Sequence, residues 1–214
     1  MPAKQIFCNH SKQPVSYSII HGFDLPLTLQ ADHDWNLEKM RIVKQLFADH
    51  PDAQTDPSKL EKLFTDYNLT DWHWIWNCKA FDRMGKGYEW FYLVAENKVQ
   101  GICIIFHPKE SPLHSDNIFY VDYIAAAYWN RPRPNYKRQF DNLGTILLSY
   151  CVKYSVDQLK YRPGFFLHSL PTAEGYYSKK GLRDLGIDTQ YEDLRIFEAS
   201  ESCSIKIMKE YADA

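Results

Sequence analysis

The chain has 214 residues, a formal net charge of −2 and five cysteines at scattered positions. This length suits one domain with a well-buried core, and the charge excludes a generally basic surface of the kind that binds nucleic acid. The cysteines lack the spacing of a zinc site or a disulfide framework, which indicates free thiols in a reducing compartment. The chain also lacks a signal peptide and an apolar run long enough for a bilayer. We therefore expect residues 1–214 to form a single cytoplasmic domain.

Periodicity and capping residues predict the elements of the first half of the chain. These are a strand over 13–20, a helix over 35–48, a short helix starting at Pro57, and a hairpin of strands 88–95 and 99–107. Asp34 and Asp56 each precede a helical pattern and are suited to cap it. Pro26 marks the stretch before Asp34 as irregular.

The stretch 69–81 fits two different structures. Trp72, Trp74 and Trp76 recur at every second position, as in a strand. The residues after Trp76 suit a buried helix equally well. We favour a helix or an irregular segment here.

The second half of the chain predicts a strand, a helix, a strand and a helix, followed by a pair of strands. Their ranges are 118–129, 142 or 143 to 157, 164–169, 173–180, 194–199 and 204–208. The first of these strands is apolar almost throughout, as a strand covered on both faces should be. Because a helix joins it to the next strand, the two should be parallel.

This order of elements predicts an α/β fold of the mixed (α+β) kind. Antiparallel strands come first, and a single parallel βαβ crossover follows. We expect a mixed, mostly antiparallel central sheet of about six to seven strands, with helices on both faces.

A polar loop leads directly into the helix that begins near residue 142. Its sequence is Gln139-Phe140-Asp141-Asn142-Leu143-Gly144-Thr145. The start of a helix presents free backbone N–H groups and carries a partial positive charge of about half a unit. The loop is therefore a candidate site for a phosphate or pyrophosphate group.

This loop and residues 173–182 resemble the two signatures of the GNAT superfamily of acetyl-CoA-dependent N-acetyltransferases. The family's pyrophosphate loop, Gln/Arg-x-x-Gly-x-Gly/Ala, reads Gln139-x-x-Asn142-x-Gly144 here. Asn142 replaces a glycine, and Asn is the non-glycine residue that best tolerates left-handed backbone angles. The second signature, Ala-x-x-aromatic-Tyr-x-Lys-x-Gly-Phe, matches residues 173–182 with Leu182 in place of Phe.

The resemblance extends from about residue 88 to residue 210 and implies a GNAT-like sheet with acetyl-CoA as the cofactor. The pantetheine arm would lie where the central strand and the next strand separate, and the pyrophosphate would lie at the loop. The residues implied to bind the cofactor are Ile124, Ala125, Ala126, Arg138, Gln139, Phe140, Asp141, Asn142, Leu143, Gly144, Thr145, Ala173 and Tyr177. The family's strand-to-helix loop is shorter, so Arg131-Pro132-Arg133-Pro134 is an insertion by comparison.

Tyr177 and Asp122 are the candidate catalytic residues. Tyr177 falls at the signature tyrosine, and a phenol can protonate a departing thiolate. The alternative is that Tyr177 is a core ring on an amphipathic helix, the role that we expect for Tyr176. Asp122 is a carboxylate in an otherwise apolar strand and is the candidate base for the amine proton, acting directly or through water. Many members of the family carry an acidic residue on this strand. The alternative is that Asp122 pairs with an Arg or Lys, or occupies an exposed position.

Trp74 and Trp76 are candidates to line the acceptor pocket. The aromatic content is high, at 15%, and large rings in such number commonly line a pocket. The alternative is that these rings only pack the core. No histidine shows metal-ligand spacing, so we expect no metal.

The function that the sequence predicts is transfer of acetyl from acetyl-CoA to a primary amine by direct attack in a ternary complex. The expected partner is a small-molecule amine and not nucleic acid or a membrane, and a homodimer stays open. The first alternative is an acetyltransferase acting on a protein or charged tRNA, suggested by the basic loop 131–138. The second is a non-catalytic acyl-CoA-binding regulatory domain.

Overall fold

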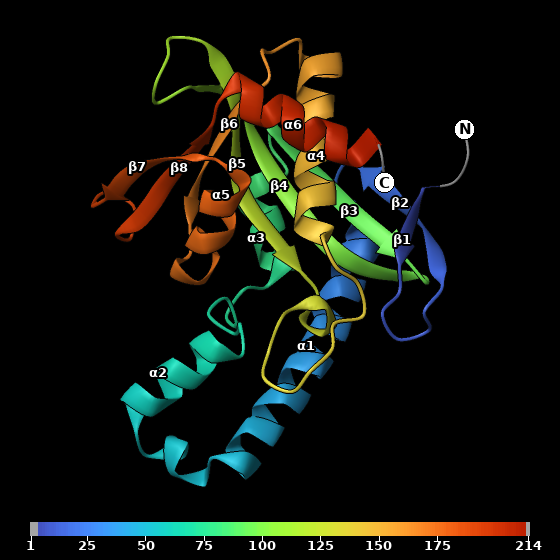
Figure 1. Ribbon diagram of the computed structural model, residues 1–214, viewed down its shortest axis with the longest axis vertical. Helices are drawn as coiled ribbons and strands as arrows, with labels where there is room; N and C mark the ends of the chain where they lie inside the picture. Colours follow the sequence, from blue (N-terminus) through green and yellow to red (C-terminus); the bar gives the residue numbers. More distant parts are fainter. Residues whose placement is uncertain (1–3, 213–214) are drawn as a thin grey trace.

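The computed structural model describes residues 4–212, which form one mixed sheet with helices on both faces (Figure 1). The sheet has eight strands in the order β1-β2-β3-β4-β5-β6-β8-β7. The strands are β1 (Gln5–Phe7), β2 (Pro14–His21), β3 (Tyr88–Ala95), β4 (Lys98–Glu110), β5 (Asn117–Ala126), β6 (Phe165–Ser169), β7 (Arg183–Asp188) and β8 (Leu194–Ala199). All neighbouring strands are antiparallel except β5 and β6, which are parallel as predicted.

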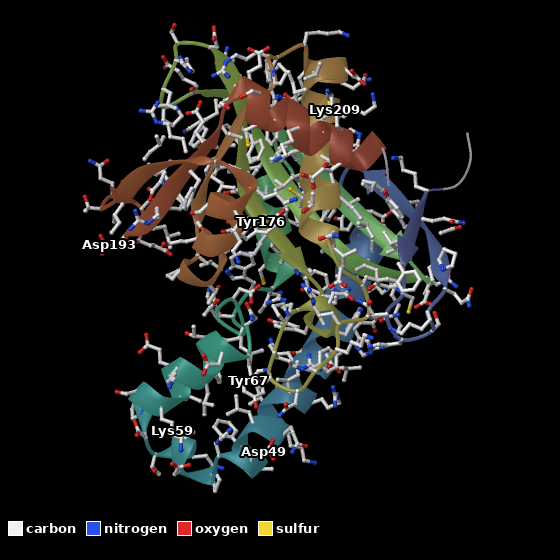
Figure 2. The ribbon with its side chains drawn as sticks, in the orientation of Figure 1. Asp49, Lys59, Tyr67, Tyr176, Asp193 and Lys209 are labelled. Carbon is white, nitrogen blue, oxygen red and sulfur yellow. The ribbon has the colours of Figure 1, made fainter. Side chains whose placement is uncertain are left out.

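The helices divide between the two faces of the sheet. They are α1 (Leu25–Asp49), α2 (Pro57–Asp66), α3 (Trp76–Arg83), α4 (Leu143–Tyr154), α5 (Glu174–Lys180) and α6 (Glu201–Ala212). In Figure 1, α4 and α6 cross in front of the sheet, and α1 and α3 lie behind it. The far half of α1 and the whole of α2 project from the sheet, and Figure 2 marks this end with Asp49 and Lys59.

The predicted strand count of six to seven was too low. The sequence reading missed β1, which has only three residues, and β7, which is an edge strand. A glycine with φ of +93°, Gly186, interrupts the pattern of β7. The sequence analysis also predicted a strand over 204–208, which is part of α6 in the structure.

The first helix begins ten residues earlier than predicted. Its N-cap is Asp24, whose carboxylate accepts a hydrogen bond of 2.9 Å from the N–H of Leu27. Pro26 lies in the first turn, where the missing N–H costs nothing. The prediction of an irregular stretch at Pro26 was therefore wrong, because Pro26 belongs to the start of α1 and Asp34 lies inside the helix.

The stretch 69–81 is an irregular segment followed by α3, as favoured above. α3 is held to α1 through the carboxylate of Asp32, which accepts hydrogen bonds from the N–H groups of Trp76 (2.7 Å) and Asn77 (2.9 Å). The expected hairpin, the helix at Pro57 and the helix after residue 142 are also confirmed.

Candidate active site

β5 and β6 separate after three paired residues. Val121 and Leu167 are the last pair, and β5 continues to Ala126 without β6 beside it. A cavity of about 50 Å³ lies at this point. This gap cavity is lined by Trp74, Val121, Asp122, Tyr123, Ile124, Leu167, His168, Leu170, Ala173 and Tyr177. Its lining residues come from both faces of the sheet. The gap therefore lies between the face covered by α5 and the face covered by α3.

A β-bulge at Asp122 shapes the wall of this gap. On β4, Ile104 pairs with Tyr123 and the next residue, Ile105, pairs with Val121, so Asp122 is the extra residue. A bulge disturbs the alternation of side chains along a strand. Asp122 and Tyr123 accordingly both contact α3 or the residues just before it.

The carboxylate of Asp122 is buried and paired with Arg83. Its side chain is 7% exposed, and Asp122 Oδ2 accepts a hydrogen bond of 3.0 Å from Arg83 Nε. Burial raises the pKa of Asp122, and the nearby charges of Arg83 and Lys79 only partly oppose this. The pairing with an arginine that the sequence left open is present, and the carboxylate still lines the gap cavity.

Tyr177 lines the same cavity from the other face of the sheet. It lies on α5, is 6% exposed and packs against Phe197, with the ring centroids 5.8 Å apart. Burial raises the pKa of its phenol well above the ordinary value. The two candidate catalytic residues, 55 positions apart in sequence, are thus brought to one cavity.

Tyr176 packs against the edge of the core, in line with the core role predicted for it. It is half-buried, and its hydroxyl shares a hydrogen bond of 2.9 Å with the hydroxyl of Thr145. Figure 2 shows Tyr176 on the side of α5 that faces α4. Consecutive helix residues lie about 100° apart, so Tyr176 must face a neighbouring helix once Tyr177 faces the core. The adjacent positions of the two tyrosines in the sequence already indicated that their rings face different neighbours.

The candidate phosphate loop, residues 139–145, has an open helix start. Asn142 adopts the left-handed conformation with φ of +61°, as its replacement of glycine predicted, and its side chain does not cap α4. The first helical hydrogen bond runs from the N–H of Ile146 to the carbonyl of Asn142 (3.0 Å). The amides of the intervening residues 143–145 therefore have no partner within the helix. A cavity of about 490 Å³ borders this start, lined in part by Asn142 and Thr145.

The apolar side chains of the loop are buried in the core, and its polar side chains pair with other side chains of the protein. Phe140 and Leu143 are buried in the core. Arg138 pairs with Asp141 (2.7 Å), and the Gln139 amide donates to Glu96. What the loop offers a ligand is therefore mainly its backbone N–H groups.

The start of the chain is fastened to this loop. Cys8 and Phe140 form an isolated antiparallel bridge, and the N–H of Asn9 donates to the carbonyl of Gln139 at 2.7 Å. The side-chain amide of Asn9 also donates to Asp141 (2.7 Å). The N-terminal residues thereby support the outer side of the phosphate loop.

The remaining cofactor-site candidates lie on β5 and before α5. Ile124 and Ala173 both line the gap cavity. Ala125 and Ala126 pair with β4, and the carbonyl of Ala126 accepts a hydrogen bond of 2.7 Å from Arg131. The structure therefore brings Ile124 and Ala173 to the gap but engages Ala126 elsewhere.

The tryptophans separate into different environments. Trp74 lines the gap cavity, whereas Trp76 is 2% exposed and packs edge-on against Trp35 at 5.6 Å. Trp72 is half-exposed. Of the two rings predicted to lie at the acceptor pocket, Trp74 is at the gap and Trp76 is in the core.

A second cavity, of about 430 Å³, opens on the other side of the gap. This α3-side cavity shares with the gap cavity the residues Trp74, Asp122, Tyr123, His168 and Leu170. It is also lined by charged residues of both signs, namely Lys79, Asp82, Arg83 and Glu192. A molecule in this cavity would meet the gap at Asp122.

His168 is a site residue that the sequence reading missed. Its Nδ1 lies 3.0 Å from the hydroxyl of Tyr120, and its Nε2 lies 3.1 Å from Asp188 Oδ2. It lies near the carboxyl end of β6, where a strand parallel to its neighbour commonly carries site residues. This position was the available signal.

The inserted basic loop packs onto the protein itself. Arg131 is paired with the buried Asp71 at 2.5 Å, and Arg133 is paired with Glu38 of α1 at 3.0 Å. These ion pairs fasten the loop to α1 and to the segment before α3. Both arginines are therefore already engaged.

Two properties of the described residues bear on the kind of site. Within residues 4–212, no three potential metal ligands cluster together, and no helix combines the length and apolar character needed to cross a membrane. All five cysteines are free thiols, as predicted, and Cys103 and Cys151 lie in the core with their sulfurs 3.7 Å apart.

Comparison with known proteins found similarity in structure only. No family model and no curated protein matches the sequence. A GNAT-family acetyltransferase from Listeria monocytogenes is 11% identical, with 91% of this chain and 98% of that chain covered and a TM-score of 0.47. An acyl-CoA N-acyltransferase from Pseudomonas aeruginosa is 11% identical (87% and 99% covered, TM-score 0.47). An acetyltransferase from Streptococcus agalactiae is 13% identical (85% and 96% covered, TM-score 0.45).

Proposed function

We propose that this chain is an acetyl-CoA-dependent N-acetyltransferase that acts on a primary amine by direct attack. The observation that carries this proposal is the gap cavity between β5 and β6, which is lined by both Asp122 and Tyr177. An uncapped helix start lies on one side of the sheet and an open cavity lies on the other. This arrangement suits a phosphate-bearing cofactor and an acceptor that approach one reaction point from opposite sides.

The residues present fit coenzyme A at its pyrophosphate and along its pantetheine arm. The free amides of residues 143–145 would bind the pyrophosphate, since a helix start favours anions. Ile124 and Ala173 would flank the pantetheine arm in the gap. When bound there, acetyl-CoA supplies an acetyl group activated as a thioester.

Asp122 would accept the proton that the attacking amine loses. Its raised pKa brings it closer to working pH, where a base is most effective. The hydrogen bond from Arg83 holds one carboxylate oxygen in place. Tyr177, on the opposite wall, would donate its phenolic proton to the departing thiolate.

A small-molecule acceptor is favoured over RNA or charged tRNA. The basic loop was the only feature that suggested a nucleic acid, and its Arg131 and Arg133 are paired with Asp71 and Glu38. The α3-side cavity of about 430 Å³ is large enough for a small amine. Binding to RNA that weakens steeply with salt would contradict this preference.

The direct test is thiol release from acetyl-CoA in the presence of amines from several classes. Polyamines, amino acids, amino sugars and short peptides should be supplied separately, with each amine omitted in turn as the control. Turnover that requires both the amine and the cofactor is the expected result. Coenzyme A binding without turnover on any amine would favour the non-catalytic acyl-CoA-binding domain instead.

A further inference from the structure

Lys79 of α3 lines the α3-side cavity and places its amine over two aromatic rings. Its Nζ lies 3.4 Å from the ring centroid of Tyr123 and 4.6 Å from that of Trp74. Both distances are within the range of about 6 Å for a cation–π contact. The two rings line the gap cavity as well as the α3-side cavity. A primary amine of the protein itself thus lies where the acceptor would have to approach.

The surroundings of Lys79 lower the pKa of its amine. Among the ion pairs of the described residues, none involves Lys79, and the nearby Asp122 is bound to Arg83. Burial, assisted by the positive charge of Arg83, lowers the pKa of Lys79 from 10.5 to about 8. An amine must be neutral to attack a carbonyl carbon, so a larger share of Lys79 is reactive near neutral pH than of an exposed lysine.

We propose that Lys79 is an acetyl acceptor in its own active site, so that the protein acetylates itself there. This proposal rests on the proposed function. The lone pair of Nζ forms a bond to the acetyl carbonyl carbon, and the C–S bond breaks with its electron pair leaving on sulfur. Nζ loses one proton to Asp122, and the sulfur gains one from Tyr177. Lysine and acetyl-CoA become Nε-acetyl-lysine and free coenzyme A.

The chain offers a matched reference for this reaction. Lys86 lies seven residues further on, is exposed and faces neither cavity. The lowered pKa of Lys79 also speeds its purely chemical acetylation, so Lys86 gives the background rate of an exposed amine, and the Tyr177→Phe variant measures the part of the Lys79 rate that the enzyme supplies.

The experiment incubates the full chain with acetyl-CoA carrying an isotopically labelled acetyl group and follows the label at each lysine by peptide mass spectrometry. Lys79 should gain label at least about tenfold faster than Lys86, because positioning and the lowered pKa both accelerate attack. Its rate should not depend on protein concentration. Labelling of Lys79 no faster than Lys86, or a rate that rises with protein concentration, would overturn the proposal.

Two variants separate an enzymatic label from a chemical one. Tyr177→Phe should slow labelling of Lys79 and leave Lys86 unchanged. Lys79→Arg keeps a cation over the rings and should abolish the fast label. Equal labelling of Lys79 in wild type and Tyr177→Phe counts against the proposal.

Turnover of soluble amines, measured in parallel, distinguishes the two proposals. If a soluble amine is acetylated while Lys79 stays unlabelled, self-acetylation is wrong and the proposed function stands. If neither is acetylated although coenzyme A binds, both are wrong. Fast label at Lys79 supports self-acetylation whether or not a soluble acceptor is found.

Discussion

Asp122 and Arg83 are joined at 3.0 Å across the boundary between β5 and α3. The β-bulge makes this contact possible, because position 122 is the extra residue on β5 and Asp122 lies on the α3 side together with Tyr123. Asp122 therefore lines both the gap cavity and the α3-side cavity, and Arg83 lines the α3-side cavity.

Asp122→Asn should lower turnover by roughly 10²–10⁴-fold while coenzyme A binding is retained. The amide keeps the shape but cannot accept a proton. Because the pKa of Asp122 is raised, the wild-type kcat/KM should fall as the pH drops through that pKa and the carboxylate becomes protonated. The variant should lose this acid limb and recover partly at high pH, where more of the amine is already neutral.

The matched control is Asp82→Asn. Asp82 also pairs with Arg83 (3.0 Å), but its side chain is 75% exposed, and it lines only the outer α3-side cavity and not the gap cavity. Its removal should change the pH–rate profile little. If Asp122→Asn gives a profile of the same shape and height as wild type, Asp122 has only a structural role.

Tyr177→Phe should reduce turnover by roughly 10²–10⁴-fold with nearly normal folding and cofactor affinity. The change removes one hydroxyl and keeps the ring that packs on Phe197. Tyr176→Phe is the comparison, because it removes the hydroxyl that contacts Thr145 and leaves the gap intact. Single-turnover rates and calorimetry measure the two effects separately. Wild-type rates in Tyr177→Phe would assign Tyr177 to the core.

Gly144→Glu should weaken binding of coenzyme A. A Cβ at Gly144 would meet only the hydroxyl of Tyr176, at 3.9 Å, so the backbone tolerates a side chain while the added charge repels the pyrophosphate. Gly85→Glu adds the same charge in open space in the turn before β3. Calorimetry should show a loss of affinity for the first variant and no change for the second. If the two variants bind coenzyme A with equal affinity, the cofactor does not bind at this loop.

Arg131→Ala should destabilise the fold by about 3–5 kcal/mol, because it leaves the buried carboxylate of Asp71 without its partner. Lys137→Ala, at an exposed position of the same loop, should change stability by no more than about 0.5 kcal/mol. Urea denaturation of both variants tests this. Similar urea midpoints for Arg131→Ala and Lys137→Ala would mean that the ion pair of the inserted loop does not stabilise the fold.

Lys79 should make stability rise with pH between about 8 and 10.5. Its pKa is about 8 in the folded protein and returns to 10.5 on unfolding, so the unfolded chain binds more protons in this window. Other groups titrate there too, so the measurement is the difference in unfolding free energy between wild type and Lys79→Met at several pH values. That difference should move in favour of wild type as the pH rises. A difference independent of pH would contradict a lowered pKa.

Local patterns in the sequence predicted much of the fold and the backbone conformation of the loop that leads into α4. The left-handed backbone of Asn142 followed from its replacement of a glycine. The parallel pairing of β5 and β6 followed from the helix between them. The backbone of Asn142 and the pairing of β5 with β6 both depend on a short stretch of chain. Residue type and spacing within such a stretch are enough to predict them.

The errors arose where two structures share one local pattern. In α6, Ile205 and Ile207 alternate as in a strand, but Cys203 and Ile207 lie one helical turn apart and face the core. Asp24 and Asp34 are equally good caps, and only packing of the whole of α1 selects the first. At the site, the β-bulge directs Asp122 toward α3, which carries Arg83 and Lys79. The end of β6 brings His168 to the gap cavity. No short-range signal in the sequence specifies such contacts.

The fastening of the N-terminus to the phosphate loop also has a consequence for folding. The side chains of Asn9 and Asp141 meet across a separation of 132 positions. Contacts so distant in sequence carry a large loop-closure entropy and form slowly. During synthesis, the first ten residues leave the ribosome long before the loop exists. We therefore expect the outer support of the loop to be completed late, after the hairpins and helices have formed locally.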